Sequence, residues 1–184
     1  MSGSDKFTDT TAFRIAAIAV LSAIVTIFTI AIRIPIAPTR GYINLGDVAI
    51  YFAAFVFGPV SAFFAGGIGT ALADILGGYG QWAPISFLVH GLQGLLVGIV
   101  YNLVLAREKD KTANIFITGI ICFLTGSLIM VSGYFLASVF MVGPGAALFE
   151  VPGNIIQNIA GVVGGIILSF SVRKAYPPVV NFRW

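Results

Sequence analysis

Uncharged apolar runs of membrane-spanning length recur along this chain and constrain its fold more than any other feature. The first run, Ile15 to Ile32, contains 18 residues and no charge. A bilayer core about 30 Å thick requires about 20 apolar residues in a helix. Charged residues make up 9% of the chain and hydrophobic residues 58%, whereas soluble domains carry about 25% charged residues. The sequence therefore predicts an all-α integral membrane protein, multi-pass in the cell membrane.

Proline, glycine and polar residues divide the chain into six expected spans that form a single membrane domain. These spans cover residues of about 12–33, 47–58, 59–76, 84–105, 113–140 and 152–172. The first span is stopped by Pro35 and Pro38, because proline lacks a backbone donor and disfavours helix in the residue before it. The segment 34–43 is accordingly expected to be an irregular loop.

The topology depends on the region between two carboxylates, Asp47 and Asp74. Asp74 lies 27 residues after Asp47, a length of about 40 Å in one straight helix, which overshoots the bilayer core. Gly58-Pro59 provides the expected break, so the region is either one kinked span or a hairpin of two short ones. Three basic clusters should face the cytoplasm by the positive-inside rule; they contain Lys6 and Arg14, then Arg107, Lys109 and Lys111, then Arg173, Lys174 and Arg183.

An even number of crossings must separate the first two clusters, and the hairpin satisfies this condition. Both termini are then cytoplasmic. Asp47 and Asp74 fall on the outer side, together with the 34–45 loop and the turn at 77–83. Asp47 follows Asn44-Leu45-Gly46 and could simply cap a helix, whereas Asp74 is equally consistent with a structural or a functional role.

Polar side chains recur at helical spacing near the outer ends of two later spans. Ser86, His90 and Gln93 are spaced i, i+4, i+7 and share one helix face. The span that starts near Pro152 repeats this spacing in a second polar group of Glu150, Asn154 and Gln157. Each residue could be an ordinary buried or interfacial group, and Tyr79 and Trp82 could be interfacial aromatics. Two such faces at similar depth nevertheless favour a ligand pocket.

Several classes of function are poorly supported. No GxxxxGK[ST] phosphate loop occurs, so any ATP hydrolysis must come from another chain. One histidine and one cysteine give little basis for a metal site, and no basic, aromatic-rich run indicates nucleic-acid binding. We expect no cofactor. Two alternatives stay open: an intramembrane hydrolase that uses Ser86 and His90, and a small channel, standalone transporter or structural partner.

Five motifs carry a resemblance to a known family. They are NLGD (44–47), FGP (57–59), GGIGTALADILGGY (66–79), WAP (82–84) and HGLQG (90–94). Together they resemble the substrate-binding S components of energy-coupling factor (ECF) vitamin transporters. The sequence looks closest to the branch that includes hydroxymethylpyrimidine and related thiamine-precursor transporters. The resemblance is dense from about residue 40 to 100 and looser elsewhere.

The resemblance implies a high-affinity substrate-binding subunit of a vitamin importer that works with a transmembrane coupling subunit and two ATPase subunits in the lipid bilayer. The alanine face of the first span, Ala16, Ala19 and Ala23, resembles the docking face for the coupling subunit, although alanine is also simply a good helix former. The 34–45 segment resembles a lid over the ligand.

The expected ligand is a small heteroaromatic vitamin or precursor. A carboxylate can accept from a ring amino group, amides can satisfy ring nitrogens, and an aromatic side chain can cover the ring face. Hydroxymethylpyrimidine is favoured, and pyridoxine or another ring vitamin is an alternative. The candidate substrate-binding residues are Asn44, Tyr79, Trp82, His90, Gln93, Glu150, Asn154 and Gln157.

Overall fold

The computed structural model describes residues 10–106 and 114–183 as a helical bundle with one small β-hairpin. In chain order the elements are α2 (Thr11–Ala31), β1 (Arg33–Ile36), β2 (Gly41–Asn44), α3 (Gly46–Val56), α4 (Pro59–Gly77), α5 (Ala83–Ala106), α6 (Asn114–Val142), α7 (Pro144–Ala147), α8 (Glu150–Ala175) and the 3-10 helix η1 (Pro177–Phe182). The all-α prediction therefore holds apart from the two short strands.

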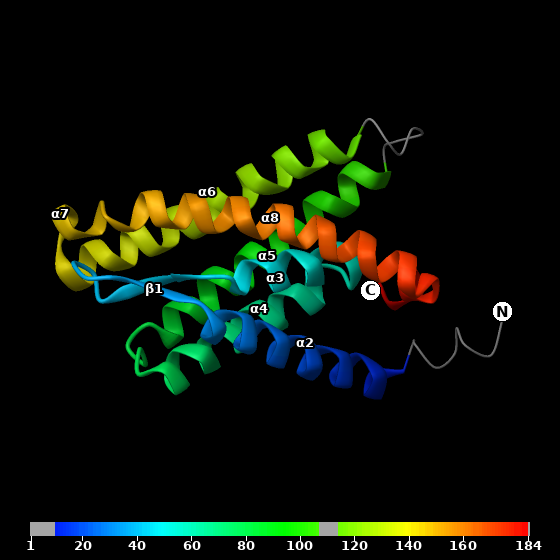
Figure 1. The fold of residues 1–184 in the computed structure, drawn as a ribbon, viewed down its shortest axis with the longest axis horizontal. Coiled ribbons are helices and arrows are strands. Elements are labelled where there is room, and N and C mark those ends of the chain that lie inside the picture. The colour runs from blue at the N-terminus through cyan, green and yellow to red at the C-terminus, as the bar shows by residue number, and fades with distance from the viewer. Residues whose placement is uncertain (1–9, 107–113, 184) are drawn as a thin grey trace.

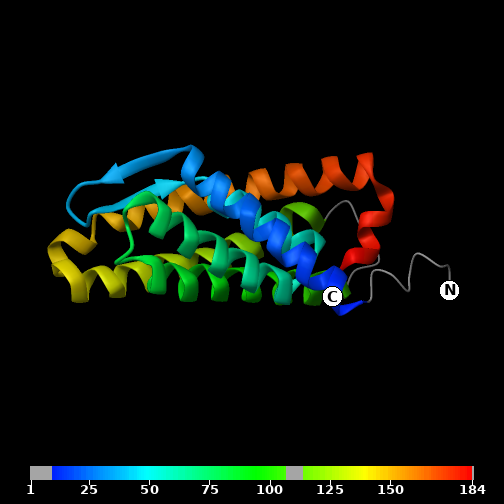
Figure 2. The same ribbon diagram turned by 90° about the horizontal axis from the view of Figure 1, so that it is seen from below.

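The long helices lie side by side along the long axis of the molecule (Figures 1 and 2). The start of α2 and the end of α8 lie together at one end, which we call the terminal end. The β-hairpin, the turn between α4 and α5, and α7 lie at the opposite end, which we call the hairpin end. Successive long helices thus run between the same two ends of the molecule.

Five of the described helices are long and apolar enough to cross a membrane: α2, α4, α5, α6 and the α7–α8 segment. Helix α3 has only 11 residues, about 16 Å at the usual rise per residue, so it cannot cross the bilayer core alone. The chain reverses between α3 and α4 at Gly58, whose φ of 95° favours glycine. Pro59 then begins α4, where its missing N–H costs nothing. A sixth span stays a prediction.

The segment expected to be an irregular loop forms an antiparallel hairpin instead. Strand β1 pairs with β2 in a register that sets Pro35 opposite Tyr42 and Arg33 opposite Asn44. Proline is compatible with an edge strand, and both strands of a two-stranded sheet are edges. The hairpin lies across the hairpin end of the bundle, above α8 in Figure 2.

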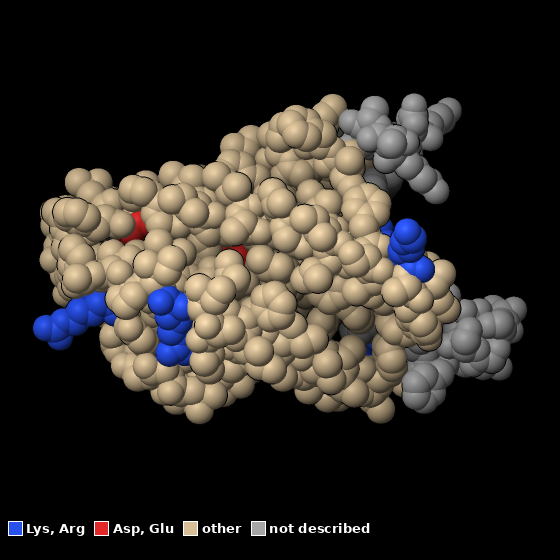
Figure 3. Space-filling view, viewed as in Figure 1, with Lys and Arg blue, Asp and Glu red and all other residues tan. Residues whose placement is uncertain are grey.

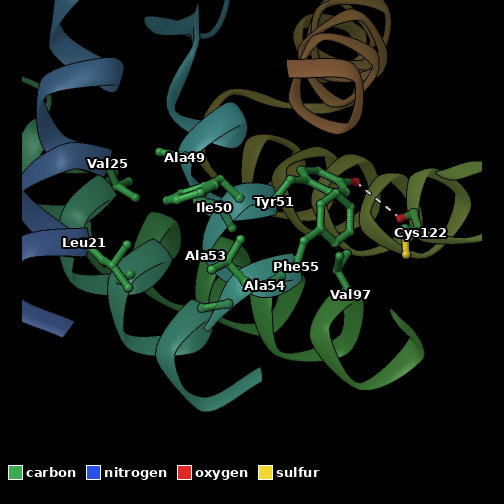
Figure 4. Close-up of a cluster of buried hydrophobic side chains, with 14 of the residues drawn as sticks. Leu21, Val25, Ala49, Ile50, Tyr51, Ala53, Ala54, Phe55, Val97 and Cys122 are labelled. Atoms are coloured by element: carbon green, nitrogen blue, oxygen red, sulfur yellow. Dashed lines mark hydrogen bonds between the residues drawn. The ribbon is translucent and has the colours of Figure 1, made fainter. Parts of the chain in front are cut away.

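Helix α3 forms the centre of the bundle, and each of its residues from Asp47 to Val56 is buried except Val48. Its Tyr51 reaches toward α6, where its hydroxyl donates to the Cys122 carbonyl over 3.3 Å (Figure 4). Glycines permit the close approach of its neighbours: a Cβ at Gly161 of α8 would lie 2.7 Å from Asp47 Cβ. A Cβ at Gly94 of α5 would lie 2.6 Å from the Ala62 carbonyl oxygen, as small-residue packing between membrane helices requires.

The outer surface is suited to lipid. Large apolar side chains are exposed around the bundle, among them Phe140 at 89% and Phe116 at 76%. In Figure 3 the basic side chains lie toward the two ends of the visible face, with a broad uncharged surface between them. The acidic side chains appear on this face only as small recessed areas. Exposed apolar area on this scale indicates a lipid environment.

Candidate functional site

A cavity lies at the hairpin end, lined by the hairpin and five of the long helices. It is lined by Thr29 of α2, by Gly41, Tyr42 and Asn44 of β2, by Thr70 and Asp74 of α4, by Trp82, by Ser86 and His90 of α5, by Met130 and Tyr134 of α6, and by Glu150, Asn154 and Gln157 of α8. Polar groups from distant parts of the sequence thus converge on one enclosed space, as expected of a small-molecule site.

The lining includes most of the residues expected from the sequence but excludes two of them. Tyr79 lies outside the cavity and packs its ring on Tyr42, with 4.6 Å between ring centroids. Gln93 lies one layer deeper, with its Oε1 2.8 Å from His90 Nδ1. In this conformation Tyr79 thus contacts the hairpin and Gln93 contacts His90, and neither lines the cavity.

Helix α8 holds the hairpin from below through two polar contacts. The Thr39 hydroxyl donates to Glu150 Oε1, and the Asn44 backbone N–H donates to Gln157 Oε1 over 2.8 Å. The backbone approaches so closely that a Cβ at Gly41 would lie 2.7 Å from Glu150 Oε1. Spacing of i, i+4, i+7 on α8 places Glu150, Asn154 and Gln157 in line beneath the hairpin.

Helices α4 and α5 hold the hairpin from the other side. The Tyr42 hydroxyl donates to Asp74 Oδ1 over 2.6 Å, and Trp82 Nε1 donates to the Arg40 carbonyl over 3.2 Å. Burial, followed by the charge of Asp74, raises the pKa of Tyr42, so the hydroxyl keeps its proton and remains the donor. The guanidinium of Arg33 stacks over the Tyr42 ring at 5.0 Å. We call these four contacts, Thr39–Glu150, Asn44–Gln157, Tyr42–Asp74 and Trp82–Arg40, the latch.

Several buried polar atoms of the lining residues have no hydrogen-bond partner among the described residues. They are Asn154 Nδ2 and Gln157 Nε2, which are donors, and Asp74 Oδ2, which is an acceptor. Buried polar atoms are nearly always paired, because an unmet one keeps its full desolvation cost. These three atoms offer a ligand two donors and one acceptor inside the cavity.

Aromatic side chains line the cavity from three parts of the chain: Tyr42 of β2, Trp82 just before α5 and Tyr134 of α6. Trp82, which precedes α5 and is 3% exposed, lies 5.8 Å from the Tyr134 ring of α6 between centroids. Tyr134 in turn lies 5.5 Å from the His90 ring and shares a 2.7 Å hydrogen bond with Ser86. Such rings provide an apolar wall for a flat ligand.

Sequence reasoning missed the contributions of α2 and α6. Met130 and Tyr134 lie in the long apolar helix α6, and Thr29 lies in α2. In α2, Ser22, Thr26 and Thr29 have the same i, i+4, i+7 spacing as the polar faces of α5 and α8, and this signal was overlooked. The tyrosine hydroxyl within α6 was the available signal. Asp74, for which the sequence left both roles open, lines the cavity, whereas Asp47 lies behind His90.

Asp47 does not cap helix α3, the structural role that the sequence left possible. Helix α3 begins after Leu45 without any side-chain capping bond. The local turn is made by Asn44, whose Oδ1 accepts from the Gly46 N–H over 2.7 Å. Asp47 Oδ1 instead lies 3.2 Å from His90 Nδ1 in the interior.

The cavity is nearly closed in this conformation. Its volume is about 20 Å³, which is close to the space that one water molecule needs. A ring-sized ligand therefore requires the hairpin or the lining side chains to move outward.

The pairing that an intramembrane hydrolase would need is not formed among the described residues. Ser86 shares its hydroxyl hydrogen bond with Tyr134, and His90 Nδ1 contacts Gln93 and Asp47. A nucleophile and its base should lie within hydrogen-bond reach. The geometry gives this alternative no support.

Comparison with known proteins gives one family match and two similar relatives. Residues 10–174 match the family model described as "ECF-type riboflavin transporter, S component". A Pyrococcus woesei protein described as "Uncharacterized protein in gap 3'region" is 33% identical over 157 residues, which cover 85% of this chain and 99% of that relative. The "Thiamine precursor transporter HmpT" of Lactococcus lactis subsp. cremoris (strain MG1363) is 32% identical over 162 residues, 88% of each chain.

Proposed function

This chain belongs to the ECF-type transporter S-component family, and from that premise we propose that it is the substrate-binding subunit of an importer for a small heteroaromatic vitamin or precursor. The resemblance read from the five sequence motifs is thereby confirmed. The family and the five apolar helices make the chain a multi-pass plasma-membrane protein. The names of the family and of the relative indicate a transporter and not an enzyme.

The single observation that carries the proposal is the enclosed polar cavity under the hairpin. Its unpaired donors, Asn154 Nδ2 and Gln157 Nε2, suit ring nitrogens or oxygens, and its carboxylates, Asp74 and Glu150, suit a ring amino group. Trp82 and Tyr134 supply apolar faces. An aminopyrimidine combines all of these features in one ring.

A thiamine precursor is the favoured ligand. The relative named as a thiamine precursor transporter aligns over 88% of both chains. The cavity of about 20 Å³ also favours a single ring over the three-ring system of riboflavin, since a smaller ligand requires a smaller displacement of the lining.

The hairpin acts as the lid in this proposal. It covers the cavity and is held by the four latch contacts, which join it to α4, α8 and the start of α5. All four contacts are hydrogen bonds made by residues of the hairpin, so they can open without unfolding a helix. Substrate enters when the latch opens and is sequestered when it closes.

Coupling to ATP hydrolysis is assigned to partner subunits, a transmembrane coupling subunit and two ATPases. Ala16, Ala19 and Ala23 lie on the exposed side of α2, whereas Leu21 and Val25 on its other side are buried in the bundle. A row of small exposed residues permits the close approach of another membrane helix. This row is the proposed docking face.

The proposed topology is a single six-helix membrane domain with both termini in the cytoplasm. The hairpin end then faces outward, toward the source of substrate, and the terminal end faces inward. The short helix α3 reaches only part of the way across and is completed by the hairpin strands above it. The basic residues of α8, Arg173 and Lys174 in its last turn, fit the inward assignment.

Calorimetric titration of the purified protein with hydroxymethylpyrimidine, thiamine, pyridoxine and riboflavin tests the proposal. We expect saturable binding of hydroxymethylpyrimidine without ATP, and weaker or no binding of riboflavin. Glu150→Gln keeps an oxygen that can accept from Thr39 but removes the charge, so it should weaken binding by about tenfold. The absence of binding heat for every member of the panel would contradict the proposal.

A further inference from the structure

Two buried ionisable side chains, His90 of the cavity lining and Asp47 behind it, form a close contact to which no role has been assigned so far. His90 Nδ1 lies 3.2 Å from Asp47 Oδ1, and their side chains are 2% and 0% exposed. Neither carboxylate oxygen of Asp47 has a hydrogen-bond partner among the described residues. Among the residues that the structure describes, His90 is the one basic side chain within 4 Å of the Asp47 carboxylate.

A chain of amide hydrogen bonds fixes which ring nitrogen of His90 carries a proton. Asn158 Nδ2 donates to the Asn154 carbonyl over 3.0 Å, which leaves Asn158 Oδ1 to accept from Gln93 Nε2 over 2.9 Å. Gln93 then presents its oxygen to His90 Nδ1 at 2.8 Å. Because an amide oxygen can only accept, Nδ1 must be protonated.

The charge of the pair follows from the surroundings of Asp47. A carboxylate without hydrogen bonds is strongly disfavoured in a low-dielectric interior unless a cation neutralises it. Nδ1–H of His90 donates to Gln93 Oε1 and lies 3.2 Å from Asp47 Oδ1, and a second proton on Nε2 would supply the neutralising positive charge. His90 also lines the cavity, so Nε2 is the ring nitrogen available to a ligand.

We propose that Asp47 is a positioning residue that holds His90 as an imidazolium, and that the cavity therefore selects a ligand with a hydrogen-bond acceptor for His90 Nε2–H. A neutral histidine with its proton on Nδ1 would instead present an acceptor and would select a donor. The ligand class is thus a heterocycle that offers an amino donor to Glu150 or Asp74 and a ring nitrogen or oxygen to His90. This inference rests on the proposed function for the identity of the site.

Nitrogen NMR of the purified protein with labelled histidine tests the first half of the proposal without any ligand. The chain has one histidine, so the spectrum reports His90 alone, and protonated and unprotonated ring nitrogens resonate far apart. At neutral pH we expect two protonated nitrogens in the wild type. One unprotonated nitrogen would overturn the proposal.

The variant Asp47→Asn removes the charge at constant shape, and Nε2 should then lose its proton. Asp74→Asn is the matched control, because Asp74 is also buried and faces His90, as does Tyr134, but its carboxylate accepts from Tyr42. The control should keep both protons. Two protonated nitrogens in Asp47→Asn would overturn the role of Asp47, and if that variant does not fold, the wild-type spectrum decides.

Binding measurements test the second half. Asp47→Asn should weaken hydroxymethylpyrimidine binding by about ten- to a hundredfold, the range for a hydrogen bond with a charged partner. A deaza analogue, in which the ring nitrogen that contacts His90 is replaced by C–H, should bind wild type and Asp47→Asn equally. If Asp47→Asn weakens the binding of every deaza analogue as much as that of the parent ring, the role of Asp47 is purely structural. The proposed selection of a hydrogen-bond acceptor by His90 is then overturned.

The two proposals fail in different ways. If hydroxymethylpyrimidine and the other ring vitamins do not bind the wild type, the proposed function fails, while the histidine spectrum still decides the role of Asp47. If the wild type binds but Asp47→Asn changes neither the spectrum nor the affinity, the function stands and the inference about Asp47 fails.

Discussion

The hydroxyl of Tyr42 in the hairpin donates to Asp74 Oδ1 of α4 over 2.6 Å, and this contact joins two segments that are 32 residues apart. It closes one side of the cavity, and Asp74 Oδ2 remains without a partner among the described residues. Under the proposed function, the same carboxylate fastens the lid with one oxygen and offers the other to the ligand, which links lid closure to ligand recognition.

Removal of the hydroxyl should loosen the lid. Tyr42→Phe eliminates a hydrogen bond to a charged acceptor, a contribution of about 1.5–3 kcal/mol, so ligand dissociation should accelerate by about tenfold or more. Stopped-flow measurement of ligand release gives the rate. Tyr79→Phe is the control, because Tyr79 contacts Tyr42 through its ring and keeps that ring in the variant. An equal acceleration in both variants would argue against the latch.

A methyl group at Gly41 should disturb the carboxylate beneath the hairpin. The added Cβ would lie 2.7 Å from Glu150 Oε1, which also accepts from Thr39, so either the carboxylate or the hairpin must shift. Calorimetry should show affinity reduced by about tenfold in Gly41→Ala, the loss of one charged hydrogen bond.

The control for this substitution is Gly80→Ala, at the same end of the molecule. A Cβ there meets no atom within 4 Å among the described residues, and Gly80 has no positive φ. Its affinity should match that of the wild type. Unchanged affinity in Gly41→Ala would show that the hairpin does not need its close approach to α8.

Bulk on the exposed face of α2 should impair transport but not binding. Ala19→Leu places a larger side chain in the alanine row, where close helix approach would be blocked. Calorimetry on the isolated subunit should be unchanged, while ATP-driven uptake in vesicles with the coupling module should fall several-fold. Val20→Leu, exposed beside the row, should transport normally. Full uptake by Ala19→Leu would show that the alanine row is not the docking face.

The terminal end should lose stability when Arg183 is removed. Its guanidinium donates to the Phe55 carbonyl at the end of α3 and to Asn102 Oδ1. The negative end of the α3 dipole also stabilises a cation at this position. Thermal unfolding in detergent should show Arg183→Ala less stable by about 1–3 kcal/mol. Lys174→Ala, at an exposed position, should unfold like the wild type. Identical unfolding curves for the two variants would show that the contacts of Arg183 with Phe55 and Asn102 do not stabilise this end.

Local chemistry explains which parts of this structure could be predicted from sequence. Gly58-Pro59 breaks a helix wherever it occurs, because glycine tolerates positive φ and proline begins the next helix without a donor. The polar face of α8 could be predicted from the sequence because Glu150, Asn154 and Gln157 repeat at helical spacing in a largely apolar span. Both features depend on residues within a few positions of each other.

The parts that were missed depend on contacts between distant residues. Pro35 indicated an irregular loop, yet it lies in an edge strand that pairs with β2, where Tyr42 lies opposite it. Asp47 fitted a local capping pattern, but its partner His90 lies 43 residues further along the chain. Tyr134 lies in a long, mostly apolar helix, and its hydrogen-bond partner Ser86 lies 48 residues away in the chain.

Fluorescence of Trp82 offers the most direct test of the claim that ligand binds beneath the hairpin. The chain has two tryptophans; Trp82 lines the cavity, and Trp184 lies outside the described residues. In a Trp184→Phe background, titration with hydroxymethylpyrimidine should produce saturable quenching, with the same dissociation constant that calorimetry gives. Calorimetric binding with no change in Trp82 emission at saturation would contradict the account.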